Sequence, residues 1–425
     1  MRPRDVAFSS HVSRLASSCR FPDSAAPWEM PLTHRFLPLA LMALAACASR
    51  DSRLASAVVD TLPNGTITVH NTGPTLWTDS ANAWRLVEVA RIEGMADTTS
   101  PLMEPGPSSL DPFGRIVVVE RSPASIKVFT RDGRLVRQFG REGSGPGEFQ
   151  SPSVVAFDSL IVADEPGLAR LEVFDSLGHL LREYPAPCCY FYAISLDDSG
   201  RVYARTGSAD STKSGAFVRI NSRTGVTDTI ELDKLGDEKM WTLKAGDGSI
   251  RYGIPYAPQE VVAFTPTGHA LYGWSSAYRW TEFTQAGDTV RVVTRDWTPV
   301  ERPEAIRRAR FDTLVKRAAR QFGEAAVRAA FHFGDIPAEA EAMRSIESDR
   351  AGRVWVSVFT GDTLHREYEI FDATGVLLGR LHAPWPADEY VQWRTANEVL
   401  TQGETDEGFP MLRIWRVQEG QGGQE

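Results

Sequence analysis

Cysteine is scarce in this chain, which excludes a fold held together by a network of disulfides. Four cysteines occur in 425 residues, and two of them, Cys188 and Cys189, are adjacent. Cys19 lies upstream of Met30, the second methionine, and Cys47 stands at the end of an apolar run. These positions cannot form a long-range disulfide framework, so the fold must be held by its hydrophobic core.

An excess of basic residues is also absent. The formal net charge is -9, whereas a surface that binds nucleic-acid phosphates needs clustered positive charge. Nucleic acid is therefore not an expected partner. With 42% hydrophobic and 24% charged residues, the chain is too apolar for a disordered protein and long enough to bury a large core.

The sequence contains neither a GxSxG nucleophile elbow nor a phosphate-binding P-loop. The glycine-rich stretch from Gly140 to Glu148 opens a strand rather than a helix, which argues against a dinucleotide-binding fingerprint. His179, His269 and His382 fall in turns or outer strands of different units, without the spacing of metal ligands. We therefore expect no catalytic residue, no metal and no cofactor.

The N-terminal region has the pattern of an export signal that starts at Met30. Residues 1–29 show neither helical nor strand periodicity, and we interpret them as a mis-assigned upstream extension. A short positive region at His34-Arg35 then precedes the apolar run Phe36–Ala46, which is too short to span a bilayer as a stable helix.

The end of this apolar run, Leu44-Ala45-Ala46-Cys47, resembles a bacterial lipobox. The resemblance implies that residues 30–47 are a lipoprotein signal peptide and that Cys47 is lipidated and becomes the mature N-terminus. Cleavage as an ordinary signal peptide is the alternative, disfavoured because the cysteine ends a run of small residues. Ala48 and Ser49 follow, with no Asp after the cysteine; the resemblance to Gram-negative lipoproteins implies the outer membrane rather than retention at the inner one.

One pattern occurs on both sides of the glycine-rich stretch Phe139–Pro152. The segments 114–139 and 158–184 each contain an apolar strand with an acidic end (Glu120, Asp164), a polar loop, a Val-Phe strand, a glycine turn and a further strand. A unit that recurs at this length indicates a repeat architecture. Glycine and proline between the two units allow the backbone to turn sharply.

Further units of the same kind follow, and the last lacks an outer strand. The six units lie at about residues 104–139, 150–184, 201–232, 261–294, 349–381 and 391–417. A DxxGR turn opens a strand at Asp111, Asp197 and Asp349. We interpret it as a hairpin turn in which Asp accepts local amide hydrogens and Gly takes a positive φ.

Three segments fall outside the repeats. Residues 48–83 are polar and rich in turns, and Asn64-Gly65 predicts a small hairpin on a tether. Residues 233–258 form a connection without a clear period. The polar tail 418–425 ends the chain.

Residues 301–344 form an insert between the fourth and fifth units, with apolar residues at helical spacing. Gly323 should divide the insert into two helices. We expect the apolar stripe to pack on the body formed by the repeated units. The opposite face is basic, and such faces are usually only solvated; a site for an anionic ligand is the less expected reading. The basic residues are Arg307, Arg308, Arg310, Lys316, Arg317, Arg320 and Arg328.

The repeated units resemble NHL-type repeats, and the whole chain is similar to bacterial six-bladed β-propeller proteins of that kind. The residues that carry the resemblance are Val162-Ala163-Asp164, Arg170, Val173-Phe174-Asp175, Gly178, Gly145-Pro146-Gly147-Glu148-Phe149 and Pro152. The first unit departs from the pattern at Glu120 and Ser125, so an Asp–Arg pair within one unit is expected only for Asp164 and Arg170. The family sets a fold but no single function.

The expected fold is all-β, a six-bladed propeller over residues 84–417 closed by pairing of its N- and C-terminal strands. Arg85–Ile92 should pair antiparallel with Met411–Val417, because the sixth unit lacks an outer strand and ring closure removes open edges. The apolar positions that this strand would bury are Leu86, Val87, Val89 and Ile92, with Trp415 across from them.

One end of such a propeller should collect the loops and links that bind ligands. The link between an outer strand and the next inner strand lies at the same end as the loop between the second and third strands. The residues we place on this ligand-binding face are Arg141, Glu148, Asp164, Glu165, Arg170, Cys188, Cys189 and Tyr190. The insert should lie over the same face.

The central tunnel offers few candidate metal ligands. The inner-strand positions that should face it are Ser108, Ser153, Tyr190, Glu260, Glu347 and Gln392. Two scattered carboxylates make a poor cage for a hard cation such as Ca²⁺, which takes six or more oxygen ligands.

These observations favour a monomeric, lipid-anchored propeller of the outer membrane that binds an envelope protein, a peptide or a glycan. The side of the membrane stays open. A hydrolase or lyase with a tunnel metal is the alternative, and an enzyme is the less favoured class. A third hypothesis is redox sensing at Cys188-Cys189, because adjacent thiols in an oxidising compartment are exposed to oxidation; an inert buried pair is the alternative there.

Overall fold

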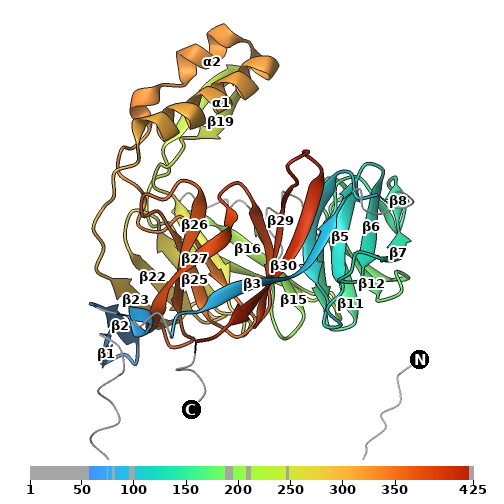
Figure 1. Cartoon of the computed structure of the whole chain (residues 1–425), viewed down its shortest axis with the longest axis horizontal. Helices are drawn as coiled ribbons and strands as arrows, with labels where there is room; N and C mark the ends of the chain where they lie inside the picture. Colours follow the sequence, from blue (N-terminus) through green and yellow to red (C-terminus); the bar gives the residue numbers. More distant parts are fainter. Residues whose placement is uncertain are drawn as a thin grey trace, which may run out of the picture. The chain divides into compact units, whose positions relative to one another are not determined.

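The computed structural model describes residues 57–420, apart from 74, 79–81, 95–100, 187–194, 207–211 and 246–247. This part of the chain forms a six-bladed β-propeller, in which the strands of each blade are antiparallel (Figure 1). None of the helices in the described residues is both long and apolar enough to cross a bilayer.

Blades 1 to 3 follow one another along the chain. Blade 1 contains β4 (Pro105–Leu110), β5 (Ile116–Arg121), β6 (Ala124–Phe129) and β7 (Leu135–Phe139). Blade 2 contains β10 (Ser153–Phe157), β11 (Leu160–Glu165), β12 (Arg170–Asp175) and β13 (Leu180–Pro185). Blade 3 contains β14 (Ser195–Leu196), β15 (Arg201–Thr206), β16 (Lys213–Asn221) and β17 (Thr227–Asp233).

Blades 4 to 6 complete the ring. Blade 4 contains β20 (Glu260–Phe264), β21 (Ala270–Trp274), β22 (Arg279–Phe283) and β23 (Thr289–Arg295). Blade 5 contains β24 (Ser345–Ser348), β25 (Val354–Val358), β26 (His365–Phe371) and β27 (Leu377–Pro386). Blade 6 contains β28 (Tyr390–Arg394), β29 (Glu398–Glu404), β30 (Pro410–Gln418) and β3 (Arg85–Glu93). The six repeat units of the sequence are therefore six blades.

The DxxGR motifs form the turns between inner and second strands, as predicted. Asp349 accepts hydrogen bonds from the backbone amides of Ala351 and Arg353 (2.9 and 3.0 Å), and from the Arg353 guanidinium (2.7 Å). Gly352 takes a φ of 78°. Asp111 and Asp197 make the same contacts with the arginines four residues later. The motif thus has a local structural role.

Six apolar clusters hold the blades together, one between each pair of neighbours. Val119 and Phe174 meet between blades 1 and 2, and Ile116, Leu400 and Leu412 meet between blades 6 and 1. Each fully buried side chain of this size contributes about 1.5–3 kcal/mol of transfer free energy. Because the last cluster joins blade 6 to blade 1, the ring has no open interface.

The chain ends meet in blade 6, where β3 pairs antiparallel with β30 from Arg85↔Gln418 to Glu93↔Met411. This is the pairing expected from the missing strand of the sixth unit. Ile92 is buried beneath blade 1, whereas Val87 and Val89 are 39% and 38% exposed. The expectation that these two valines are buried was wrong, because both lie on the outward side of the strand and a bulge excludes Val89 from the ladder.

The N-terminal hairpin is part of the propeller rather than a free element on a tether. Strands β1 (Ala57–Thr61) and β2 (Ile67–Asn71) form it around Asn64-Gly65, and β2 pairs parallel with β23 at the outer edge of blade 4. Asn71 continues the contact to blade 5: its Nδ2 donates to Gly375 O (3.1 Å) and its Oδ1 accepts from Leu377 N (2.8 Å). The expected hairpin therefore covers a blade edge.

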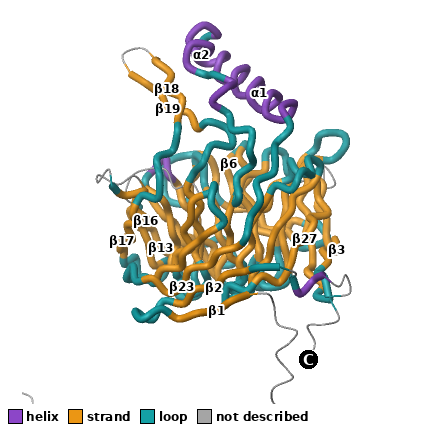
Figure 2. The backbone as a smooth tube through the Cα atoms, turned by 90° about the vertical axis from the view of Figure 1, so that its left-hand side faces the viewer, coloured by secondary structure: helices purple, strands orange, loops and turns teal. Residues whose placement is uncertain are grey.

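The insert contains two helices, α1 (Glu304–Phe322) and α2 (Glu324–Ala330), divided at Gly323 as predicted. Its apolar stripe does not pack on the propeller. It packs on a second hairpin, β18 (Met240–Ala245) and β19 (Gly248–Gly253), which the sequence analysis took for a connection without period. The Trp241 ring stacks on Phe331 with centroids 4.5 Å apart. We call these four elements the helical module (Figures 1 and 2).

A buried arginine joins the helical module to the propeller. Arg302 is 1% exposed, and its guanidinium lies 3.8 Å from the ring centroid of Tyr256 and 4.8 Å from that of Phe359, in the β25–β26 loop of blade 5. It also donates to Glu341 Oε2 (2.8 Å). Stacking and a buried ion pair together fix the base of the module above blades 4 and 5.

Ring closure predicts different effects for two positions of β3. Ile92→Ala should lower the free energy of unfolding by about 2–5 kcal/mol, because it leaves a cavity between blades 6 and 1. Val89→Ala, on the exposed side of the same strand, should change it by less than about 0.5 kcal/mol. Urea denaturation of both variants checks this. Equal losses, or none for Ile92→Ala, would contradict the role of β3 in closure.

Candidate binding face

One end of the propeller carries the features from which a binding site could be built. Because strands within a blade alternate in direction, the outer-to-inner links and the loops between second and third strands lie at the same end. Figure 2 shows the helical module at one end of the strands, and Figure 1 shows the β29–β30 loop at that end. We call this end the loop face.

The glycine-rich link between blades 1 and 2 is folded around Glu148. Strands β8 (Arg141–Glu142) and β9 (Glu148–Phe149) form a short parallel pair. The Glu148 carboxylate accepts from the amides of Ser144 (3.0 Å) and Gly145 (2.8 Å) and pairs with Arg141. The Gly145 amide, followed by Arg141, lowers the pKa of Glu148. The Glu148 side chain therefore stabilises the link in its ionised form.

Arg170 lies under the same link and does not pair with Asp164. Its guanidinium donates to the backbone carbonyls of Ser144 (3.1 Å), Gly145 (2.7 Å) and Glu148 (2.6 Å). The expected Asp164–Arg170 pair is thus wrong, because the register places Arg170 opposite Glu165, and Asp164 opposite Leu171. Neighbouring residues of a strand point to opposite faces of the sheet. Because Asp164 is one position away from the residue opposite Arg170, its carboxylate lies on the other face of the sheet.

Glu165 has a structural role of the same kind. It is fully buried and accepts from the backbone amides of Gln150 (2.7 Å) and Ser151 (2.9 Å), at the end of the glycine-rich link. Of the predicted face residues, Glu148, Glu165 and Arg170 therefore use their hydrogen-bonding groups on the protein's own backbone. Arg141 is different: its side chain is 81% exposed.

Asp164 is buried, and neither carboxylate oxygen has a hydrogen-bond partner among the residues that the structure describes. Burial, and then the charge of Glu165, raise the pKa of Asp164 to about 8. A carboxyl in such a place is held neutral at physiological pH, because an unpaired buried charge costs far more than a protonated group. The predicted residues Cys188, Cys189 and Tyr190, like Cys47, lie outside the described residues.

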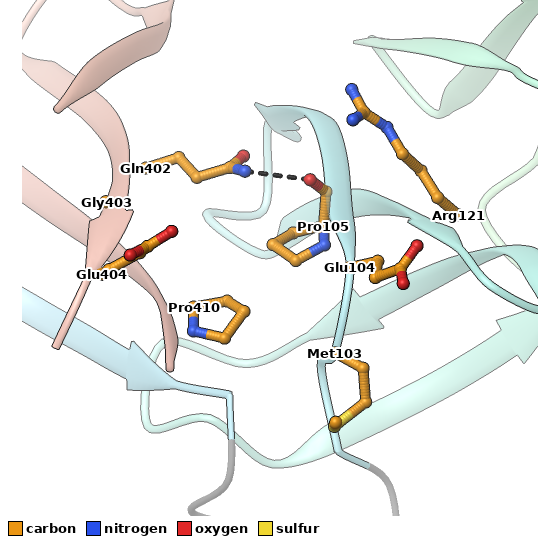
Figure 3. A pocket seen from close by; sticks show the side chains of 8 residues that line it. All are labelled: Met103, Glu104, Pro105, Arg121, Gln402, Gly403, Glu404 and Pro410. Atoms are coloured by element: carbon orange, nitrogen blue, oxygen red, sulfur yellow. Dashed lines mark hydrogen bonds between the residues drawn. The ribbon is translucent and has the colours of Figure 1, made fainter. Parts of the chain in front are cut away.

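A pocket of about 320 Å³ opens between blades 6 and 1 (Figure 3). A hydrogen bond from Gln402 Nε2 to Pro105 O (2.9 Å) joins blade 6 to blade 1 at this pocket. The lining residues are Met103, Glu104, Pro105, Arg121, Gln402, Gly403, Glu404 and Pro410. Because Arg121 ends β5 and Glu404 ends β29, the pocket lies on the loop face.

The pocket has polar groups suited to a polar ligand. The Oε1 atom of Gln402 is buried and has no hydrogen-bond partner among the described residues. Arg121, Glu104 and Glu404 are exposed around it, and Figure 3 shows their charged ends on different sides of the pocket. A buried acceptor flanked by charges of both signs can accept an amide or hydroxyl hydrogen from a ligand. The sequence pattern does not reveal this pocket, because its residues come from two blades.

The central tunnel does not hold two free carboxylates. Glu347 forms an ion pair with Arg394 in a cavity of about 260 Å³ lined by inner strands. Glu260 accepts a hydrogen bond from the hydroxyl of Tyr272 (2.5 Å). Gln392 accepts from the backbone amide of Ser108 (3.3 Å). Among the expected tunnel residues, the side chains of Glu260, Glu347 and Gln392 thus contact other parts of the protein, whereas Ser108 Oγ has no hydrogen-bond partner among the described residues and Tyr190 lies outside them.

The outward side of the helical module is basic and exposed. Arg308 and Arg328 pair with Glu304 and Glu324 one helical turn earlier. Four further exposed basic residues make no ion pair with any described residue; they are Arg310, Lys316, Arg317 and Arg320. In a chain with a net charge of -9, this local positive surface is a candidate for attraction of an acidic partner.

A family model described as a 6-bladed beta-propeller matches residues 110–263, which agrees with the observed fold. A member of the DUF4221 family from Bacteroides vulgatus is 12% identical, with 80% of this chain and 99% of that chain covered and a TM-score of 0.47. A protein of Bacteroides fragilis that is assumed to be exported is 10% identical, with 83% and 100% covered and a TM-score of 0.46.

Virginiamycin B lyase from Staphylococcus aureus is 10% identical, with 78% of this chain and 99% of that chain covered and a TM-score of 0.38. No curated protein matches the chain. Identities and scores this low carry no statement about activity, so the function has to be argued from the site.

The raised pKa of Asp164 predicts a pH dependence with a defined sign. Between the unfolded pKa near 4 and the folded pKa of about 8, the folded state keeps a proton that the unfolded state has lost. Stability should therefore fall as pH rises through this window, by up to ~1.4 kcal/mol per pH unit from this group. Asp164→Asn should remove that slope and be more stable than the wild type at pH 8.

Urea midpoints of both proteins at pH 5 and pH 8 test this sign. Asp237→Asn is the control, because Asp237 is exposed and its hydrogen bond with Lys234, a group that keeps its charge between pH 5 and pH 8, lowers the pKa of Asp237. The control substitution should change the free energy of unfolding, relative to the wild type, by the same amount at both pH values. An Asp164→Asn variant that is less stable at pH 8 than at pH 5, relative to the wild type, would show a charged and paired carboxylate instead.

Proposed function

We propose that this protein is a lipid-anchored cell-envelope propeller, related to NHL-repeat proteins, that binds an acidic partner through the helical module on its loop face. The partner is an acidic protein or peptide, or a polyanionic glycan. The observation that carries the proposal is the basic, exposed side of the module, which projects from a closed ring and is not needed to close it.

The packed core of the helical module supports a binding role. It has its own core, in which Trp241, Ala318, Val327 and Phe331 are each at most 4% exposed, and Trp241 Nε1 also donates to Asp335 Oδ2 (2.8 Å). A packed element that presents fixed side chains loses less conformational entropy on binding than a flexible loop does. Its exposed arginines are suited to bidentate contacts with carboxylates, sulfates or phosphates.

The proposed location in the cell envelope rests on the sequence around Cys47. The residues Leu44-Ala45-Ala46-Cys47 are similar to a lipobox, and a lipidated cysteine there would join a polar segment that leads to β1. With Ala48 and Ser49 after the cysteine, we place the protein in the outer membrane. Redox sensing at Cys188-Cys189 remains a hypothesis on residues outside the described part.

The alternative of a hydrolase or lyase with a tunnel metal has no specific support. The two tunnel carboxylates that it would use are Glu260 and Glu347, and each contacts another side chain. A carboxylate paired with an arginine is a poor ligand for a hard cation, since the ion would have to displace that charge. Binding without chemistry therefore agrees better with the described residues.

Cys47→Ala should release the protein from the membrane fraction of the native host. One acyl chain gives only marginal membrane binding, so stable anchoring depends on several chains on this residue. Fractionation after a salt wash, with mass spectrometry of the N-terminal peptide, measures the effect. Protein that stays with washed membranes after the substitution would refute the lipid anchor, while leaving the binding proposal open.

Reversal of charge on the helical module should strongly weaken the binding of acidic partners. Arg317→Glu with Arg320→Glu changes the exposed side of α1 without touching its core, so stability should stay within about 1 kcal/mol of the wild type. Full-length protein is used to capture partners from solubilised envelope, and the bound fraction is compared by quantitative mass spectrometry. We expect at least a tenfold loss of acidic partners.

The matched control is Arg134→Glu with Arg182→Glu, which makes the same change in net charge at two exposed arginines of blades 1 and 2. It should retain the partners that the wild type binds. If both variants lose the same partners, the attraction is one of overall charge and the module is not the site. If neither variant loses them, the proposal that the helical module binds acidic partners is wrong.

A further inference from the structure

Two histidines and two carboxylates converge on the blade-4 side of blade 5, at the loop face. His365 begins β26, His382 lies on β27, and Asp362 lies in the β25–β26 loop. One ligand atom from each of these three residues lies within 4.8 Å of those of the other two. Glu367 stands directly opposite His382 in the antiparallel ladder.

We propose that Asp362, His365 and His382 bind one divalent transition-metal ion of the zinc class, with Glu367 as the fourth ligand. Imidazole nitrogen and carboxylate oxygen are the ligands that Zn²⁺ and its first-row neighbours prefer, whereas Ca²⁺ and Mg²⁺ take oxygen only. This site is separate from the basic surface of the helical module, and neither proposal depends on the other.

Three of the six ligand-to-ligand distances are close to those around a tetrahedral ion, and Glu367 has a close contact with His382 alone among the three other ligands. Bonds of about 2.0–2.1 Å in tetrahedral geometry place neighbouring ligand atoms about 3.3 Å apart. Asp362 Oδ2 lies 3.3 Å from His365 Nδ1 and 3.8 Å from His382 Nδ1. Glu367 Oε1 lies 3.5 Å from His382 Nδ1. Shifts of well under 1 Å along these edges would bring the atoms to ligand spacing.

The charges also match a divalent cation. In the described part of the chain, neither Asp362 nor Glu367 pairs with a lysine or arginine. The nearest arginine in sequence, Arg366, donates instead to the carbonyl of Ala387 (3.0 Å). Two carboxylates and two neutral imidazoles carry a charge of about -2, which one divalent ion neutralises.

The second oxygen of each carboxylate is already held, so the ligands are oriented before any ion binds. Asp362 Oδ1 accepts from the amides of Leu364 (2.7 Å) and His365 (3.1 Å). Glu367 Oε2 accepts from the hydroxyl of Thr360. The His365 and His382 rings lie with centroids 4.7 Å apart. Outer contacts of this kind fix ligand orientation and raise metal affinity.

The consequence for the fold is local. The ion would tie the β25–β26 loop to the outer strand β27 and so stiffen the loop that contains Phe359, on which Arg302 of the module base stacks. The sequence shows no metal-ligand spacing at His382, because the strand register, rather than closeness in the chain, brings the other ligands to it.

The test is a titration of the full-length, untagged protein with Zn²⁺ and with Co²⁺ as a spectroscopic probe. Thiols are alkylated in every sample, so that the four cysteines cannot act as ligands. We expect one equivalent of metal to bind at pH 7.5, with the visible absorption of tetrahedral Co²⁺. Binding should be lost at pH 5, because both imidazoles must be neutral to coordinate.

His365→Gln and His382→Gln should each weaken binding by at least about tenfold, with unchanged circular dichroism. His179→Gln is the matched control, because His179 forms a similar exposed pair with Asp175 (2.9 Å) outside the proposed site. It should bind metal as the wild type does. Equal binding by all four proteins, or no binding by the wild type, would overturn the proposal.

Discussion

The structure depends on the burial of apolar side chains between neighbouring blades. Each blade is a small sheet that cannot bury both faces by itself, and each of the six interfaces supplies the missing cover for two sheets. The interface of blades 6 and 1 can form only when β3 joins β30, since Ile92 belongs to it. The stability of every blade therefore depends on contacts between residues that lie near the two ends of the chain.

A closed ring leaves its loops free to carry other structures. The helical module is formed by two insertions, one between β17 and β20 and one between β23 and β24, and Arg302 at its base is buried between Tyr256 and Phe359. The same β25–β26 loop carries Asp362 close to two histidines. The loop face of blades 4 and 5 thus combines a fixed base for the module with a cluster of metal-ligand types, and both are built on strands whose positions the ring determines.

Residues that look functional in the sequence often serve the backbone here. Arg170 and Glu165 were expected on a binding face, and instead they hold the glycine-rich link by its carbonyls and amides. A link with several glycines has many accessible conformations, so hydrogen bonds from buried side chains are needed to select one. Asp164, by contrast, has no hydrogen-bond partner among the described residues, so its role cannot be a local one of that kind.

Local pattern alone determined the number of blades, the DxxGR turns, the division of the insert at Gly323 and the strand that closes the ring, because each follows from period, turn chemistry or a count of strands. Only the tertiary structure decided which side chains meet. The helices pack on β18–β19 rather than on the propeller, Arg170 misses Asp164 by one register position, and His365 meets His382 across a ladder. Such contacts depend on strand register and on surfaces far apart in the chain, and periodicity carries no information about either.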